Sequence, residues 1–127
     1  MTLKKVLSAG QCGFDHNAIS RTIQKAFDVE VVAADSLDEA MKELRKGSFA
    51  LVLVNRVFDE DGSSGLELIE RIKGDGGSPS VPVMLVSNYE EAQSEAIRAG
   101  ALPGFGKSAL GHPAMMERLR TVLEDKT

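Results

Sequence analysis

Short apolar runs alternate with amphipathic stretches along the chain, and this alternation predicts five strand–helix repeats. The apolar runs are rich in valine and leucine, which is typical of strands, and the stretches between them carry apolar residues at helical spacing. The predicted strands cover residues 6–9, 29–34, 49–54, 81–87 and 102–105, and the predicted helices cover residues 14–27, 36–46, 65–73, 88–99 and 113–123.

Polar residues and prolines at the segment boundaries predict where several helices begin. Ser36 opens the sequence SLDE, a capping box in which Ser36 and Glu39 satisfy each other's backbone donors. Asn88 and Glu91 form a second predicted capping pair at the start of the fourth helix. Pro113 suits the first turn of the last helix, where a missing N–H costs nothing.

Other positions predict which faces and edges are buried. The first helix presents an apolar face, and Pro103 places the fifth strand at an edge of the sheet because proline donates no ladder hydrogen bond. The segment GDGGSPS, residues 74–80, predicts a flexible turn. The residues expected to share the apolar face of the first helix are Phe14, Ala18, Ile19, Ile23, Ala26 and Phe27.

Five successive strand–helix repeats predict a parallel sheet with helices on both faces. The third strand is almost wholly apolar, as expected for a strand that is buried on both sides. In such folds ligands gather at the carboxyl ends of the strands. The residues expected at those ends are Gly10, Gln11, Asn55, Ser87 and Lys107.

Composition favours one soluble domain covering residues 1–127 and excludes several functional classes. The length of 127 residues fits a single domain, and a formal net charge of −4 disfavours direct binding of nucleic acid. The lone Cys12 forms no internal disulfide, which favours a reducing cytoplasm. We expect no membrane span, because no apolar stretch approaches the necessary length.

Four segments resemble the conserved parts of bacterial response-regulator receiver domains of the chemotaxis-regulator type. These segments are KKVLSAGQ at residues 4–11, FALVLVN at 49–55, VPVMLVS at 81–87 and RAGALPGFGK at 98–107. The resemblance covers nearly the full chain, and it implies a flavodoxin-like fold with strand order 2-1-3-4-5. It also implies that Ser87, Phe105 and Lys107 stand at the family's hydroxyl, aromatic and lysine switch positions.

The chain departs from the family at the residues that carry its chemistry. The family's two adjacent acidic residues align with Gly10 and Gln11, and its phosphoacceptor aspartate aligns with Asn55. A carboxylate attacks a phosphoryl donor, whereas a carboxamide does not. Magnesium prefers carboxylate oxygens, and these three positions supply none. We therefore expect no magnesium, no cofactor and no phosphorylation at the usual place, and we expect the chain not to be an enzyme.

Because Asn55 is neutral, we expect the three matched switch positions, Ser87, Phe105 and Lys107, not to keep their family roles. Because an unpaired buried ammonium is costly, we expect Lys107 to reach water, a backbone carbonyl, Asp59 or Asp61. Ser87 is expected to be an ordinary satisfied hydroxyl and Phe105 an ordinary packing residue.

Two alternatives use other residues. Asp59 or Asp61, in the loop after the third strand, is a candidate for a displaced phosphoacceptor. Cys12, just before the first helix, is a candidate redox sensor, because a helix N-terminus lowers a thiol pKa.

The leading hypothesis is a degenerate receiver that acts in two-component (phosphorelay) signalling by binding another protein. The resemblance implies docking of a histidine kinase or an output protein on the face made by residues 89–100, 102–105 and 113–124. Tyr89 and Arg98 are candidate contacts on that face, which also suits a homodimer.

Overall fold

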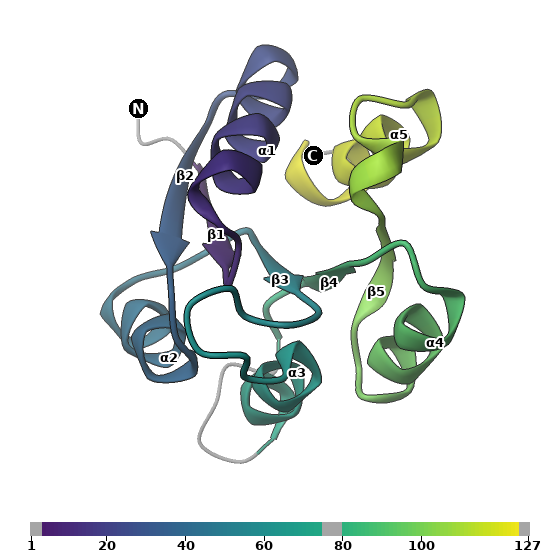
Figure 1. Cartoon of the computed structure of the whole chain (residues 1–127). Helices are drawn as coiled ribbons and strands as arrows, with labels where there is room; N and C mark the ends of the chain where they lie inside the picture. The colour runs from purple at the N-terminus through teal and green to yellow at the C-terminus, as the bar shows by residue number, and fades with distance from the viewer. Residues whose placement is uncertain (1–3, 75–79, 125–127) are drawn as a thin grey trace.

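The computed structural model describes residues 4–74 and 80–124, which form a five-stranded parallel sheet between two layers of helices (Figure 1). The strand order is β2-β1-β3-β4-β5, so the predicted flavodoxin-like α/β topology is confirmed. The strands are β1 (Lys4–Ala9), β2 (Val29–Ala34), β3 (Leu51–Asn55), β4 (Val83–Val86) and β5 (Leu102–Phe105). The helices are α1 (Gly13–Ala26), α2 (Leu37–Lys46), α3 (Gly65–Lys73), α4 (Glu90–Arg98), the 3-10 turn η1 (Lys107–Ala109) and α5 (Pro113–Leu123).

The side chains of β3 alternate between two hydrophobic cores, one on each face of the sheet. Leu51 and Leu53 pack with α1 and α5, while Val52 and Val54 pack with α2, α3 and α4. Figure 1 shows the same division of the helices into two layers. Burial on both faces explains why this strand carries an unbroken apolar run.

Strand boundaries shift by one or two residues from those predicted. β3 begins at Leu51 instead of residue 49, and β4 covers only Val83–Val86. β5 lies at an edge of the sheet and pairs irregularly with β4, which confirms the expectation from Pro103.

The predicted inward position of Phe14 is wrong, because its side chain is 80% exposed. Ile19 and Ile23 carry the buried face of α1. At about 100° per residue, Phe14 lies roughly 180° around the helix from Ile23, so the two cannot share a face. Ala26, which was also expected to point inward, is exposed.

One predicted capping motif is confirmed and the other is wrong. The backbone N–H of Glu39 donates to Ser36 Oγ at 3.1 Å, although Glu39 itself accepts from the N–H of Asp35 instead of that of Ser36. Asn88 does not cap α4, which has Tyr89 at its N-cap and no side-chain cap bond. The Asn88 carboxamide instead binds Ser108, so a tertiary contact replaces the local one.

Two sequence expectations concern segments away from the sheet. The predicted flexible turn at 74–80 falls almost entirely on residues 75–79, which lie outside the described residues. In the portion of the chain that the structure describes, none of the helices is both long enough and apolar enough to cross a bilayer.

Candidate functional site

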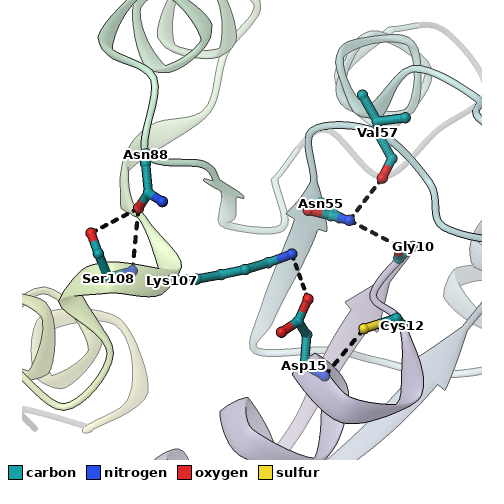
Figure 2. Close-up of polar contacts among 8 residues, drawn as sticks. All are labelled: Gly10, Cys12, Asp15, Asn55, Val57, Asn88, Lys107 and Ser108. Atoms are coloured by element: carbon teal, nitrogen blue, oxygen red, sulfur yellow. Dashed lines mark hydrogen bonds and ion pairs between the residues drawn. The ribbon is translucent and has the colours of Figure 1, made fainter.

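The fold brings the predicted site residues together at the carboxyl ends of the strands. Gly10 and Gln11 follow β1, Asn55 ends β3, Ser87 follows β4 and Lys107 follows β5. Figure 2 shows Asn55 beside Gly10, and Lys107 reaching from the η1 turn toward the start of α1.

The Asn55 carboxamide is used as a donor to two backbone carbonyls. Its Nδ2 donates to the carbonyl oxygen of Gly10 at 3.1 Å and to that of Val57 at 2.7 Å (Figure 2). Two acceptors converge on this atom, so it must be the NH₂ group and not the oxygen. A carboxylate has no hydrogen to offer these carbonyls. The amide therefore ties the loop after β1 to the loop after β3.

A glycine at the start of α3 permits this arrangement. A Cβ on Gly65 would lie 2.0 Å from the backbone oxygen of Asn55, so only glycine allows the helix to approach the end of β3. The Gly65 N–H donates to the carbonyl of Arg56 at 2.8 Å. This contact fixes the course of the chain around Asn55.

The first acidic-pair position is closed by an aromatic ring. Gly10 has φ +80°, and a Cβ there would lie 2.4 Å from the ring of Phe58. Phe58 is only 1% exposed and packs into the core formed with α2, α3 and α4. An aspartate at residue 10 would clash with this ring and would need a left-handed backbone that side chains disfavour.

The second acidic-pair position holds a buried amide. Gln11 is 6% exposed, and neither atom of its amide has a hydrogen-bond partner among the residues that the structure describes. Burying such a group without a partner costs about 1–3 kcal/mol unless a water bridges it.

The residues at these positions do not fit a magnesium ion. Gly10, Gln11 and Asn55 supply no carboxylate, and the Asn55 NH₂ group already occupies the two carbonyls that it faces. Phe58 fills the space beside Gly10. Within residues 4–74 and 80–124, no three His, Cys, Asp or Glu side chains gather closely enough to hold a metal ion.

Lys107 pairs with Asp15, a residue that the sequence analysis did not propose as its partner. The Nζ atom of Lys107 lies 2.6 Å from Oδ2 of Asp15, in the first turn of α1 (Figure 2). The expectation that Lys107 reaches Asp59 or Asp61 is therefore wrong. α1 begins beside the same end of the sheet, and it places an acid nearer to the lysine than the loop after β3 does.

The ion pair changes the acidity of Asp15. The hydrogen bond from Lys107 lowers the pKa of the Asp15 carboxyl, and it outweighs the desolvation that acts in the opposite direction. The neighbouring Cys12 is the N-cap of α1, where its Sγ accepts the N–H of Asp15 at 3.4 Å. The start of α1 and the η1 turn are thus joined by one exposed charge pair.

The remaining matched positions make ordinary structural contacts. Ser87 Oγ accepts the backbone N–H of Tyr89 at 3.1 Å, and Phe105 is 4% exposed in the core beneath α1 and α5. Asn88 Oδ1 accepts from both the backbone N–H and the Oγ of Ser108 (Figure 2). Ser108 stands directly after the lysine, so this contact positions η1.

A polar hollow of about 300 Å³ remains above Asn55, lined in part by Ser87, Asn88 and Lys107. Asp59 and Asp61 do not line it. Both are exposed, and Asp61 Oδ1 accepts the N–H of Ser63 at 3.0 Å. Hydrogen bonding by the Ser63 side chain, followed by that of its backbone N–H, lowers the pKa of Asp61.

Sequence reasoning missed two residues beside the predicted site positions: Phe58, which packs on Gly10, and Asp15, which pairs with Lys107. No role was predicted for Phe58, although a single aromatic residue within RVFDEDGSS is itself a signal of a buried anchor. No role was predicted for Asp15 either. Its position in the first turn after the first strand end could have placed it beside Lys107, given the parallel topology.

Solved structures of response regulators are similar to this chain. NtrX from Brucella abortus aligns with a TM-score of 0.81 and 20% identity over 97% of this chain, which spans 28% of the NtrX chain. A response regulator from Thermotoga maritima aligns with a TM-score of 0.74 and 21% identity, over 98% of this chain and 100% of the other.

Chemotaxis response regulator CheY4 of Vibrio cholerae aligns with a TM-score of 0.72 and 21% identity, over 96% of this chain and 100% of the other. A scan with protein-family models and a search of curated proteins both give no match. At these identities the similarity establishes architecture and not activity. The chain has the fold of the response-regulator receiver domains.

Proposed function

We propose that this chain is a receiver-like signalling module that works without aspartyl phosphorylation and acts by binding another protein. The observation that carries the proposal is the double hydrogen bond from Asn55 Nδ2 to the carbonyls of Gly10 and Val57. The position of the family's nucleophile holds a structural donor. The similar solved structures of response regulators support a role in two-component signalling.

The partner is a signalling protein, either a histidine kinase or an output protein. Its proposed docking surface is formed by α4, β5 and α5, where two large apolar side chains are exposed: Ile97 at 44% and Leu102 at 40%. The same surface could also join two copies of this chain in a homodimer, and we include that in the proposal. The lone cysteine suits a reducing cytoplasm, and we propose one domain over residues 1–127.

Two other chemical roles receive less support. Asp59 and Asp61 lie away from Lys107 and outside the hollow above Asn55, so neither has a cation placed to stabilise a transferred phosphoryl group. Cys12 is the only cysteine in the sequence, so an oxidised form has no resolving thiol within the chain.

The test is phosphotransfer to the wild-type chain. The protein is incubated with acetyl phosphate and Mg²⁺, and its intact mass is measured before and after hydroxylamine treatment. We expect the mass to remain that of the unmodified chain. A stoichiometric phosphoryl adduct that hydroxylamine removes would overturn the proposal, and peptide mapping would then separate Asp59 from Asp61.

A further inference from the structure

A second concave surface lies between α3 and α4, and it shares part of α4 with the proposed α4–β5–α5 surface. We call it the α3–α4 groove. It has a volume of about 750 Å³ and is lined by residues that include Arg56, Val57, Leu66, Tyr89, Glu91 and Glu95. Ile97 and Leu102 do not line it.

The groove presents exposed apolar side chains above a partly apolar floor. Tyr89 is 61% exposed and Val57 is 41% exposed, and both line it together with Leu66 and Leu85. Few large apolar side chains reach solvent on the described part of this chain, and two of them meet here. Aromatic and aliphatic anchors of this kind dominate the energetics of protein interfaces.

The Tyr89 ring is held in place by a cation. The guanidinium carbon of Arg56 lies 4.8 Å from the centre of the ring, within the range of a cation–π contact. Both residues also line the smaller hollow above Asn55, so they form the wall between the two concavities. The wall of the groove is therefore preformed, which reduces the ordering cost of binding.

The charge of the groove selects the kind of ligand. Glu90, Glu91 and Glu95 line the α4 side, and none of them forms an ion pair with another residue in 4–74 or 80–124. Against these three carboxylates stands one cation, Arg56. The excess of negative charge repels nucleic acid and anionic lipid and attracts basic peptide.

We propose that the α3–α4 groove binds a basic amphipathic segment of a partner protein. Its apolar residues lie on Val57, Leu66 and Tyr89, and its lysine or arginine side chains meet the glutamates of α4. An amphipathic helix laid in a groove between two helices is a common mode of peptide recognition. This binding does not depend on the chemistry at Asn55 or on Ile97 and Leu102, which do not line the groove.

The probe is a synthetic peptide of about 12 residues, roughly 18 Å long as a helix, with leucines on one face and lysines on the other. It is titrated into the ¹⁵N-labelled full chain at low salt. We expect saturable shifts at Val57, Leu66, Tyr89 and Ala92, with a Kd below roughly 1 mM. The same peptide with glutamate in place of lysine is expected not to bind.

Matched variants separate the groove from general charge attraction. The combined changes Glu90→Gln, Glu91→Gln and Glu95→Gln are expected to weaken binding roughly tenfold. Asp28→Asn, Glu30→Gln and Asp35→Asn remove the same charge from exposed positions away from α3 and α4, and this variant is expected to keep nearly the wild-type Kd. Equal weakening by both sets, shifts centred on Ile97 and Leu102, or equal binding of the glutamate peptide would each overturn the proposal.

Discussion

At the scale of single residues, the amide of Asn55 is part of the framework, because it joins the loops after β1 and β3. Its position was predicted from the motif FALVLVN, because a buried strand that ends at a polar residue marks the carboxyl edge of the sheet. Its two hydrogen bonds were not predictable, since the carbonyls of Gly10 and Val57 reach it only through the fold.

Restoring the acid at this position should destabilise the fold. Asn55→Asp removes two donated hydrogen bonds and places a carboxylate against two carbonyl oxygens, so we expect a loss of about 1–3 kcal/mol in the free energy of unfolding at pH 7. The same surroundings raise the pKa of the introduced carboxyl in the folded state. The cost is therefore largest above that pKa and shrinks as the pH falls and the group becomes protonated.

Urea unfolding of both proteins at pH 7 and at about pH 4 measures this difference. Asn55→Ala loses the same two hydrogen bonds without adding a charge, so its cost relative to the wild type should not vary with pH. An Asn55→Asp protein as stable as the wild type at pH 7 would show that the amide is not a structural donor.

The Asp15–Lys107 pair makes a separate, smaller contribution. Its hydrogen bond lowers the pKa of Asp15 in the folded state, so the stabilisation is complete above the unfolded pKa of about 3.9 and is lost as the pH falls through the lowered value. Both side chains are partly exposed, at 38% for Lys107 and 25% for Asp15, which limits the gain to less than about 1 kcal/mol.

Titration of the Asp15 carboxyl by NMR tests this assignment. In the wild type we expect its pKa below that of a free aspartate, and in Lys107→Met we expect it to rise. Lys25→Met, which changes an exposed lysine later in the same helix, serves as the control. An unchanged Asp15 pKa in Lys107→Met would mean that another group holds it down.

At the scale of elements, the spacing of apolar residues predicted most helices and strands. Tertiary contacts determined how individual helices are capped. Buried strands and amphipathic helices follow from the spacing of apolar residues, and the boundaries moved by only a few positions. Asn88 was expected to cap α4, yet it binds Ser108 across the loop after β5. Local capping rules do not contain such long-range partners, so this contact was beyond sequence reasoning.

The packing of Phe58 against Gly10 couples the loop after β3 to the end of β1. Gly10→Ala should cost about 2–4 kcal/mol, because it adds left-handed backbone strain to a clash with the ring. In a Phe58→Leu background the clash is relieved and only the strain remains, so the cost should fall by about 1 kcal/mol or more. Chemical denaturation of the four proteins in this double-mutant cycle measures the coupling, and strictly additive losses would contradict the packing account.

At the scale of the whole molecule, the order of the strands in the sheet was predicted only from the family resemblance. The spacing of apolar residues predicts a parallel sheet but does not order its strands. The fold is that of the receiver domains, while side chains take up part of the edge that carries the family's chemistry. Phe58 occupies the space beside Gly10, Asn55 holds the two loops, and Lys107 is engaged with α1. We therefore propose that the whole edge, and not one substitution, prevents aspartyl phosphorylation.

This claim is tested most directly by phosphotransfer to the Asn55→Asp variant. The variant is mixed with acetyl phosphate and excess Mg²⁺, and phosphate incorporation is followed by intact mass over time, with its fold verified by circular dichroism. The account predicts no incorporation, because the introduced acid has neither a neighbouring acidic pair nor a free lysine. Rapid, magnesium-dependent labelling of that single variant would contradict it.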